Sequence, residues 1–287
     1  MKVVLAGYGK MGRLLETRLL EKGHQVLAAV DPYYKGPFYK GDSYPGATKP
    51  GADKPGSSSS APQEMIVYAS LEDALKGAPG KSLKDADVVF EFTQPDQAVK
   101  NLLFLAKEKI PTVTGTTGWY GKLDEVSQAV NAEGSSLVWS SNYSLGVNIF
   151  YRIAANAAKL MDPFAEYDVA GCETHHNKKA DSPSGTAKTL VERVLAQMTR
   201  KKKAVYEMLD RPPAADELHY ASVRVGTVPG IHSLLFDSAA ETIEITHTAR
   251  NRGGFAAGAV LAAEWLTAKK RIGVFTVDDA FADILPQ

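Results

Sequence analysis

The sequence predicts an α/β protein in two parts, a parallel β-sheet domain wound with helices and then an α+β domain. Up to about residue 142, short apolar runs alternate with amphipathic segments, which is the pattern of βαβ units. Beyond that point strand-like runs follow one another with few helices between them, as in α+β domains. A length of 287 residues also suits two domains rather than one. We therefore expect residues 1–142 plus 253–287 to form the first domain and residues 143–252 the second.

Hydrophobic periodicity places the elements of the first domain. Val3–Ala6 is an apolar run that meets glycines, and apolar residues at helical spacing from Met11 to Leu19 follow, so we expect a strand, a tight turn and a helix. Ser70 begins a helix start that resembles a capping box, and Pro95 suits the first turn of another helix. The further expected strands are 25–30, 66–68, 87–92, 112–114 and 137–139, with a helix over roughly 122–132.

The second domain is expected to begin with a helix over 147–161. In the strand-like run 242–248, Ile243, Ile245 and His247 alternate with polar residues. This alternation predicts a sheet with one face wetter than the other. The other expected elements are strands at 167–174, 220–225 and 233–236, a helix that starts near Ala187, and a last helix over 255–269.

Residues 36–64 interrupt the first domain with a different composition. More than half of them are Gly, Pro or Ser, and the tripeptide KPG occurs twice. Such a segment buries too little apolar surface to offset the entropy lost on ordering. Because the βα pattern resumes after it, we expect a mobile insertion within the domain rather than a linker between domains.

Composition excludes several classes of protein. Lys plus Arg and Asp plus Glu each number 33, so the formal net charge is zero, which disfavours general electrostatic binding to nucleic acid. Cys172 is the only cysteine, which rules out an internal disulfide and a multi-cysteine zinc site. No apolar run approaches the roughly 20 residues of a membrane helix, and residues 1–12 lack signal-peptide anatomy. We expect a soluble, cytoplasmic protein that binds neither nucleic acid nor membrane.

The segment Gly7–Gly12 matches G-x-G-x-x-G between an expected strand and an expected helix. In this Rossmann-type context the glycines form the turn, admit a pyrophosphate and pack helix against strand, while helix N–H groups hold the phosphates. Asp31 ends the second strand, where a carboxylate binds the ribose hydroxyls and repels a 2′-phosphate. We predict NADH or NADPH as cofactor, with NADH favoured by Asp31, although Lys10, Arg13 and Lys35 keep the preference open and a solvated Asp31 is the alternative. The predicted cofactor-binding residues here are Gly7, Tyr8, Gly9, Lys10, Met11, Gly12 and Asp31.

The segment Gly115–Gly118, with sequence GTTG, follows the expected strand 112–114. Loops at the carboxyl ends of parallel strands line the ligand crevice of an open sheet. Small residues at that position let a nicotinamide lie close to the backbone. An ordinary turn explains the same residues equally well, so the pattern leaves both interpretations open.

The stretch Glu173–Thr186 gathers the side chains best suited to catalysis. His175 and His176 are adjacent, and Lys179 follows four residues after the first of them. The sequence Ser184–Thr186 then leads into a helix, whose N-terminus offers free N–H groups and hydroxyls to a carboxylate. The stretch therefore suits a small dicarboxylic substrate, with histidine and lysine as proton donors. A polar loop with a capped helix is the simpler alternative, and it leaves the histidines and the lysine unexplained.

Two other charged features have competing interpretations. A metal site at His175 and His176 is disfavoured because adjacent strand residues point to opposite faces and no further ligand cluster is evident, so we predict no metal. Arg252 follows the last strand, and its planar guanidinium suits a substrate carboxylate. A surface charge explains Arg252 equally well.

These segments together resemble one enzyme family. Glu173–Thr186, Gly115–Gly118, Ser140–Asn148 and Glu244–His247 are similar to dihydrodipicolinate reductase, now called 4-hydroxy-tetrahydrodipicolinate reductase. The similarity covers most of the chain except residues 33–65, and the pattern H-H-x-x-K-x-D-x-P-S-G-T is highly specific to the family. The resemblance implies a Rossmann-type cofactor domain, completed by the C-terminal helix, and an α+β domain for substrate binding and oligomerisation. It also implies reduction of an unsaturated heterocyclic dicarboxylate by a nicotinamide cofactor in lysine and diaminopimelate biosynthesis.

The resemblance further implies roles for individual residues. His175 corresponds to the proton donor and Lys179 to a second catalytic group. Members of the family are usually homotetramers assembled through the sheets of their substrate domains. The implied substrate-binding residues are His176, Gly185 and Thr186, which Ser184 and Arg252 join as candidates. The implied cofactor contacts are Gly115, Thr116, Thr117, Ser140, Ser141, Asn142 and Tyr143.

Two alternative functions stay open from sequence. One is another Rossmann oxidoreductase of amino-acid metabolism, such as an aspartate or homoserine dehydrogenase, which does not require the histidine-rich segment. The other is a noncatalytic cofactor-sensing module. Such a module keeps Gly7–Gly12 and Asp31 but has no need of His175 together with Lys179.

Overall fold

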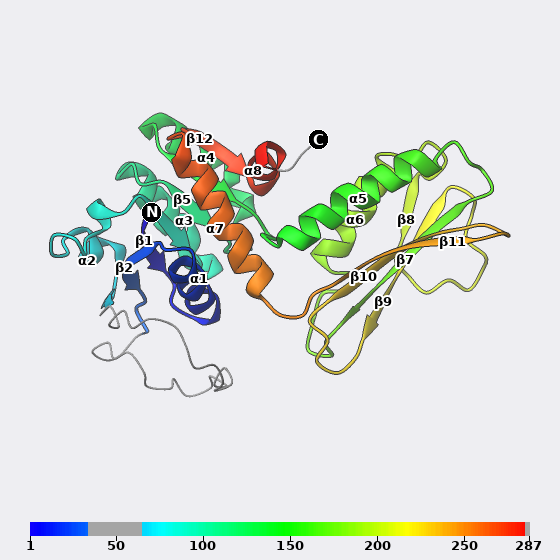
Figure 1. Ribbon diagram of the computed structural model, residues 1–287, viewed down its shortest axis with the longest axis horizontal. Helices are drawn as coiled ribbons and strands as arrows, with labels where there is room; N and C mark the ends of the chain where they lie inside the picture. Colours follow the sequence, from blue (N-terminus) through cyan, green and yellow to red (C-terminus); the bar gives the residue numbers. More distant parts are fainter. Residues whose placement is uncertain (34–64, 285–287) are drawn as a thin grey trace. The chain divides into compact units, whose positions relative to one another are not determined.

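The computed structural model describes residues 1–33 and 65–284 (Figure 1). The chain divides into two compact units, one formed by Met1–Ser141 with Val260–Ala280 and the other by Asn142–Ala259 with the segment from Phe281 onward. The insertion predicted at 36–64 lies outside the described residues, and the roles predicted for the two domains stay predictions. Within the described ranges, no helix combines the length and the apolar character that crossing a bilayer demands.

The first unit is built on a parallel seven-stranded sheet. Its strand β1 (Lys2–Ala6) pairs with β2 (Gln25–Val30) on one side and β4 (Val88–Glu91) on the other. The chain therefore runs outward from β1 first in one direction and then in the other, which creates the kind of switch point where doubly wound sheets bind ligands. This topology confirms the predicted Rossmann-type sheet. The other strands are β3 (Ile66–Tyr68), β5 (Thr112–Thr114), β6 (Ser136–Trp139) and β12 (Gly273–Thr276), in the order β12-β6-β5-β4-β1-β2-β3.

The helices of this unit are α1 (Lys10–Glu21), α2 (Leu71–Leu75), α3 (Pro95–Lys107) and α4 (Leu123–Glu133), with short 3₁₀ turns at Leu83–Asp85 and Tyr120–Lys122. Local sequence signals set their ends. Ser70 caps α2 by accepting a hydrogen bond from the Asp73 amide, and Pro95 occupies the first turn of α3. Gly134 ends α4 at φ 65°, a left-handed conformation that costs glycine little.

Both faces of the seven-stranded sheet are buried along its central strands. Val4 and Ala6 belong to an apolar cluster with Leu105 of α3. Val3 and Leu5 are also fully buried and point to the opposite face, because strand side chains alternate. The near-continuous apolar run in the sequence is therefore the signature of a strand covered on both sides.

The second unit is a five-stranded mixed sheet with two helices, which confirms the predicted α+β class (Figure 1). Its central strand β7 (Asp168–His175) runs parallel to β9 (Glu217–Arg224) and antiparallel to β10 (Ile231–Asp237). The edge strands are β11 (Thr242–Thr248) and β8 (Lys203–Val205), and the helices are α5 (Leu145–Met161) and α6 (Gly185–Leu195).

One face of this second sheet packs against α5 and α6. Val169 of β7 joins an apolar cluster with residues of both helices and of β9 and β10. Gly171, Glu173 and His175 are buried as well, while the residues between them are more exposed. The alternation places Glu173 and His175 on the same buried face, toward the carboxyl end of β7.

Helix α7 (Gly253–Ala268) passes from the second unit into the first, to which its residues from Val260 belong. Within the first unit, Glu264 of α7 forms ion pairs with Lys22 and His24. The sequence analysis missed three elements: β8, β12 and α8 (Val277–Ile284). The two strands contain only three and four residues, and at that length periodicity does not reliably distinguish a strand from another short apolar run.

Candidate active site

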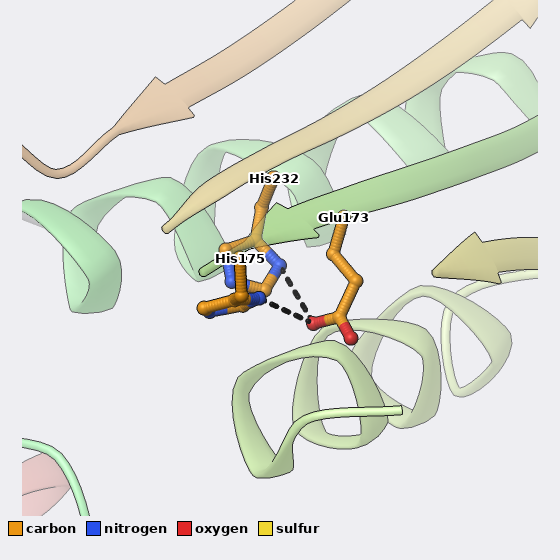
Figure 2. Close-up of side chains that lie close together, drawn as sticks. All are labelled: Glu173, His175 and His232. Atoms are coloured by element: carbon orange, nitrogen blue, oxygen red, sulfur yellow. Dashed lines mark ion pairs between the residues drawn. The ribbon is translucent and has the colours of Figure 1, made fainter. Parts of the chain in front are cut away.

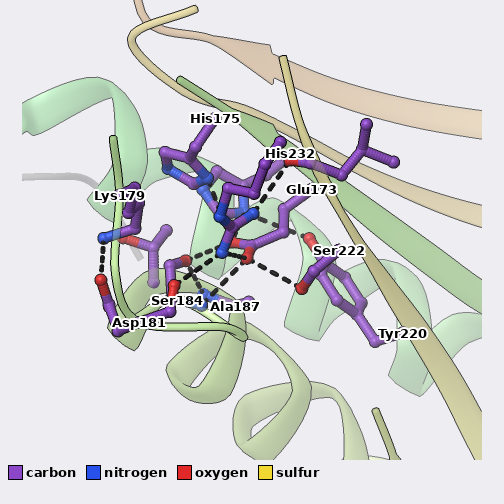
Figure 3. A network of polar contacts seen from close by, with 12 residues as sticks. Glu173, His175, Lys179, Asp181, Ser184, Ala187, Tyr220, Ser222 and His232 are labelled. Carbon is purple, nitrogen blue, oxygen red and sulfur yellow. Dashed lines mark hydrogen bonds and ion pairs between the residues drawn. The ribbon is translucent and has the colours of Figure 1, made fainter. Parts of the chain in front are cut away.

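The carboxylate of Glu173 is the centre of a buried polar network in the second unit (Figure 3). Its side chain is completely buried. Oε1 accepts hydrogen bonds from the Ser184 amide at 3.0 Å, from Ser222 Oγ at 2.9 Å and from Arg224 Nη2 at 2.9 Å, and Oε2 accepts one from Ser184 Oγ. Burial raises the pKa of this carboxyl, but the hydrogen bonds from Ser184, Arg224 and Ser222 outweigh burial and hold the pKa below its usual value. Glu173 is therefore a buried anion that accepts four hydrogen bonds, three of them at Oε1.

His175 lies beside this carboxylate (Figure 2). Its Nδ1 atom is 3.4 Å from Glu173 Oε2, within ion-pair distance, yet Nδ1 makes no hydrogen bond to any of the described residues. The ring meets His232 edge-on, with centroids 5.1 Å apart. At Gly230 a Cβ atom would lie 3.0 Å from His175 Nε2, so only glycine leaves that nitrogen uncrowded.

The protonation state of His175 is set by opposing influences. Burial lowers its pKa, the negative charge of Glu173 raises it, and Lys179 and Arg224 lower it further, with the pKa ending below the usual value. Burial also lowers the pKa of the neighbouring His232, to about 4. His232 is thus a neutral neighbour at physiological pH, and its Nδ1 lies 3.2 Å from the hydroxyl of Tyr220.

Glu173, His175 and His232 together offer three ligand atoms within 4.8 Å of one another. This cluster could not be predicted from the sequence, where only His175 and His176 are adjacent, because His232 reaches the site from another strand, β10. The Arg224 guanidinium, 2.9 Å from Glu173, already supplies a positive charge to this carboxylate. The absence of a metal at this cluster stays a prediction.

Lys179 and His176 lie in the loop that follows β7. The Lys179 ammonium is 2.7 Å from Asp181 Oδ1, and this contact lowers the pKa of the Asp181 carboxyl. The Lys179 amide donates to the carbonyl of His176 at 3.1 Å, which forms a turn. His176 is partly exposed, whereas His175 is buried. The buried imidazole of His175 at the end of β7 is therefore followed, in the loop, by one accessible imidazole and one ammonium.

The N-terminus of α6 lies directly beside Glu173. Ser184 is its N-cap, and its Oγ accepts a hydrogen bond from the Ala187 amide at 3.1 Å. The amides of Gly185 and Thr186 precede the first helical donor, Lys188, so they have no intrahelical partner. This first turn has the free amides and the positive dipole end that bind carboxylates.

The first unit holds a cavity of about 710 Å³ at the switch point beside β1. Gly7 adopts φ 89°, and a Cβ there would lie 2.2 Å from the carbonyl oxygen of Phe92. At Gly12 a Cβ would lie 2.3 Å from the carbonyl oxygen of Gly7. At Gly9 there is open space, and no side chain caps α1 there. The turn thus leaves its helix N-terminus open toward a ligand, and its residues fit a dinucleotide phosphate.

Asp31 lines the same cavity at the end of β2. Its two carboxylate oxygens accept hydrogen bonds from the amides of Tyr8, at 3.1 Å, and Tyr33, at 3.0 Å. Each carboxylate oxygen has a further lone pair, so these contacts leave acceptor capacity for a ligand hydroxyl. Lys10 and Arg13 line the cavity too, and the Arg13 guanidinium stacks 5.3 Å from the ring centre of Tyr8. The Met11 side chain is partly buried in α1.

The loops after β4 and β5 are joined by Glu91, which sequence reasoning missed. Glu91 is completely buried, and it accepts hydrogen bonds from the hydroxyl of Thr93 and, at 2.6 Å, from that of Thr114. The Thr93 amide donates to Thr116 Oγ1 at 2.9 Å. At Gly115 a Cβ would lie 2.2 Å from the ring of Phe92. No pattern in the sequence marks Glu91, because it sits inside an apolar strand.

The other predicted residues occupy varied positions. Ser140 is buried, its amide donating to the Thr114 carbonyl at 3.3 Å. Asn142 Nδ2 donates to Thr186 Oγ1 at 3.3 Å, which joins a predicted cofactor contact to a predicted substrate contact. Tyr143 is buried, whereas Ser141, Thr117 and Arg252 are exposed, Arg252 lying between β11 and α7.

Comparison with known proteins identifies the family. The model for the N-terminal part of dihydrodipicolinate reductase matches residues 1–143, and the model for its C-terminal part matches residues 146–281. The chain belongs to the dihydrodipicolinate reductase family. Its relatives include the 4-hydroxy-tetrahydrodipicolinate reductases of Christiangramia forsetii, 32% identical over 99% of both chains, and of Methanosarcina barkeri, 34% identical over 96% of this chain and 97% of the relative.

A solved structure supports the fold of this dihydrodipicolinate reductase family member. Dipicolinate-bound dihydrodipicolinate reductase from Paenisporosarcina sp. TG-14 matches over 99% of both chains with a TM-score of 0.71 and 21% sequence identity. Family membership makes the protein an oxidoreductase, and it decides against a noncatalytic cofactor-sensing module and against another class of amino-acid dehydrogenase.

Proposed function

We propose that the protein reduces 4-hydroxy-tetrahydrodipicolinate to tetrahydrodipicolinate with a nicotinamide cofactor, as a step of lysine and diaminopimelate biosynthesis. The observation that carries the proposal is the position of His175, buried on β7 next to the N-terminus of α6. A proton donor and a carboxylate-binding helix end there meet within one polar network, joined by Glu173. A heterocyclic dicarboxylate needs both.

In this proposal the substrate carboxylates bind at the first turn of α6. The free amides of Gly185 and Thr186 and the Thr186 hydroxyl donate to one carboxylate. His176 and Lys179, in the adjacent loop, add positive charge and donors, and Arg252 is the candidate partner of the second carboxylate. Ser184 stabilises this first turn as the N-cap of α6. Such fixed donors orient the ring before reaction, which avoids an entropic cost in the transition state.

The chemistry requires one hydride and one proton. Loss of the 4-hydroxyl group as water leaves a conjugated C=C–C=N system, and the bound nicotinamide supplies a hydride to it. The negative charge that develops on the ring is quenched by the proton of His175 Nε2, the nitrogen that Gly230 leaves uncrowded. The Lys179 ammonium stabilises the same charge electrostatically. The products are tetrahydrodipicolinate and the oxidised nicotinamide.

For the cofactor, we propose that NADH binds at least as well as NADPH. Asp31 lines the cavity beside the glycine turn, and a carboxylate there favours a free ribose 2′-hydroxyl over a 2′-phosphate. The chain residues proposed to hold the dinucleotide are Gly7–Gly12 and Asp31, with Gly115–Thr117 and Ser140–Tyr143 nearer the nicotinamide. Lys10 and Arg13 also line the cavity. Because their positive charges can attract a 2′-phosphate, each binding and activity assay compares NADH with NADPH.

We also propose a cytoplasmic homotetramer assembled through the sheet of the second unit, as the family resemblance implies. The face of that sheet turned away from α5 and α6 carries small and polar residues such as Ala170, Thr174 and Thr246, with exposed Val223 among them. Light scattering on the purified protein measures the assembly directly. A monomer at micromolar concentration would contradict this part of the proposal.

A steady-state assay tests the proposed function. The product of dihydrodipicolinate synthase is supplied as substrate, with NADH and NADPH compared at equal concentration, and cofactor oxidation is followed by absorbance. We expect turnover with NADH at least as efficient as with NADPH. Absence of turnover with both cofactors would overturn the proposal, and a strong preference for NADPH would overturn the role of Asp31.

A further inference from the structure

The Glu173 carboxylate touches both halves of the proposed catalytic apparatus (Figure 3). One of its oxygens faces the proposed proton donor, His175, and both oxygens hold Ser184, the N-cap of the proposed carboxylate-binding helix. We propose that Glu173 is a positioning residue that fixes the proton donor and the substrate-binding helix end relative to one another. This inference rests on the proposed function and deepens it.

The two carboxylate oxygens of Glu173 have different hydrogen-bond partners. Oε1 takes three donors, from Ser184, Ser222 and Arg224, all within 3.0 Å. This saturates Oε1 and pins the carboxylate to β9 and to the start of α6. Oε2 takes only the Ser184 hydroxyl, which leaves it one lone pair. Nδ1 of His175 lies 3.4 Å from Oε2 and Nδ1 of His232 lies 3.9 Å from it. His232 Nδ1 already has the hydroxyl of Tyr220 at 3.2 Å, so of these two histidines His175 is the one whose Nδ1 lacks a hydrogen-bond partner in the described ranges.

The Nδ1 atom of His175 lacks a hydrogen-bond partner among the described residues. Nδ1 is buried and makes no hydrogen bond within the described chain, and a buried donor without a partner is costly. A small rotation of the imidazole ring, with a shift of a few tenths of an ångström, aligns Nδ1–H with Glu173 Oε2, as catalytic hydrogen bonds tighten on substrate binding. With its proton on Nδ1 held by Glu173, His175 presents its other nitrogen, Nε2, as the one that exchanges a proton.

The same carboxylate fixes the start of α6. The Ser184 hydroxyl donates to Glu173 and accepts from the Ala187 amide, so its orientation as N-cap depends on Glu173. The backbone amide of Ser184 is held as well, at 3.0 Å. The amides of Gly185 and Thr186 follow immediately in the chain. Removing Glu173 is therefore expected to disturb proton delivery and substrate binding together.

The test is the substitution Glu173→Gln, which keeps the size of the side chain and removes its charge. The charged and titratable groups facing His175 are Glu173 on β7, Lys179 and His176 in the loop, Arg224 on β9 and His232 on β10. Among them only Glu173 raises the pKa of His175. We expect kcat to fall about 100-fold, the substrate KM to rise, and the alkaline limb of the pH–rate profile to move to lower pH. The Kd of NADH should stay unchanged.

Glu217→Gln is the matched control. Glu217 is another buried carboxylate of the same unit, paired with Arg211 at 2.8 Å, and it belongs to neither proposed site. We expect it to lower the melting temperature without moving the pH–rate profile. Equal kinetic effects of Glu173→Gln and Glu217→Gln would reduce Glu173 to a structural residue and overturn the inference.

Two further measurements keep the inference separate from the proposed function. Histidine NMR titration follows the His175 pKa without any substrate, and a lower His175 pKa in Glu173→Gln supports the inference even if the wild type turns over no substrate. An unchanged His175 pKa overturns it. Where Glu173→Gln does not fold, Glu173→Asp keeps the charge and shortens the reach. A roughly tenfold loss of kcat with a nearly unshifted pH limb supports positioning, and wild-type kcat overturns it.

Discussion

Asn142 Nδ2 donates a hydrogen bond to Thr186 Oγ1 at 3.3 Å, which ties the first residue of the second unit to the proposed substrate-binding turn of α6. Asn142 is itself fixed, because its Oδ1 accepts from the Ser144 amide at 2.9 Å. A side chain that the family resemblance assigns to the cofactor thus holds a hydroxyl assigned to the substrate. The contact gives a direct route by which substrate binding depends on the segment Ser140–Tyr143.

Asn142→Ala is expected to raise the substrate KM several-fold, because the Thr186 hydroxyl loses the partner that orients it. One neutral hydrogen bond is worth about 1 kcal/mol, which corresponds to roughly fivefold in binding. Initial-rate kinetics at saturating NADH measure this change. Asn148→Ala, which removes two other hydrogen bonds to backbone carbonyls nearby, controls for loss of stability. An unchanged KM in Asn142→Ala would show that the contact does not matter for the substrate.

Asp31→Asn is expected to shift cofactor preference toward NADPH. The amide oxygen of Asn keeps an acceptor for the Tyr8 or Tyr33 amide, while the charge that repels a 2′-phosphate disappears. Fluorescence titration of NADH and NADPH with both proteins gives the four dissociation constants. A ratio of Kd values that is identical in wild type and variant would mean that Asp31 does not face the ribose.

The sequence predicted most of the fold because its signals are local. The strand at 242–248 coincides with β11, and the predicted strand 25–30 coincides with β2, because each is a run of alternating or continuous apolar character between turn residues. Ser184 was predicted as a helix start from its residue type, and the structure shows it as the N-cap of α6. Short elements without periodicity, such as β12, were missed.

The candidate site was only partly predictable, because several of its contacts join segments that are distant in the sequence. His175 and Lys179 lie in one short stretch and were found together. Arg224 and His232 reach Glu173 from β9 and β10, and no local sequence pattern predicts these contacts between strands. One signal was available: Glu173 and His175 are two residues apart on a strand, so their side chains must share a face.

Glu91→Ala is expected to weaken cofactor binding about tenfold with little effect on the substrate site. Glu91 holds the hydroxyls of Thr93 and Thr114, and the Thr93 amide in turn holds Thr116. Without the carboxylate, the loop after β4 and the loop Gly115–Thr117, which is proposed to contact the nicotinamide, lose their common anchor. Calorimetric titration of NADH measures the loss, and histidine NMR of the second unit serves as the control. Wild-type NADH affinity would show that the loops are held by other contacts.

Stability is expected to fall as the pH drops from about 6.5 to 4, in part through His232. Burial lowers the pKa of His232 to about 4, so below pH 6.5 the unfolded chain binds a proton that the folded chain does not. A lowered pKa of a base contributes stability above the unfolded pKa, which is lost as pH falls toward the folded value. The upper limit is about 3 kcal/mol for such a shift. Urea unfolding at several pH values should show a shallower slope in His232→Asn; an identical slope would contradict the assignment.

His175→Gln and Lys179→Ala are each expected to lower kcat by orders of magnitude while the Kd of NADH stays nearly constant. General acid catalysis is typically worth about 10²- to 10⁴-fold, and the Lys179 ammonium stabilises the charge that the proton quenches. Lys179 also pairs with Asp181, so Asp181→Asn serves as a control that breaks this ion pair and keeps the ammonium.

The double variant of His175 and Lys179 should lose less kcat than the product of the two single losses, because both groups serve one proton transfer. A purely structural role predicts the opposite pattern, a lower melting temperature with kcat preserved in the folded enzyme. Melting temperature and single-turnover hydride transfer, measured on the same samples, separate the two, and near-normal transfer in both single variants would mean that another group delivers the proton.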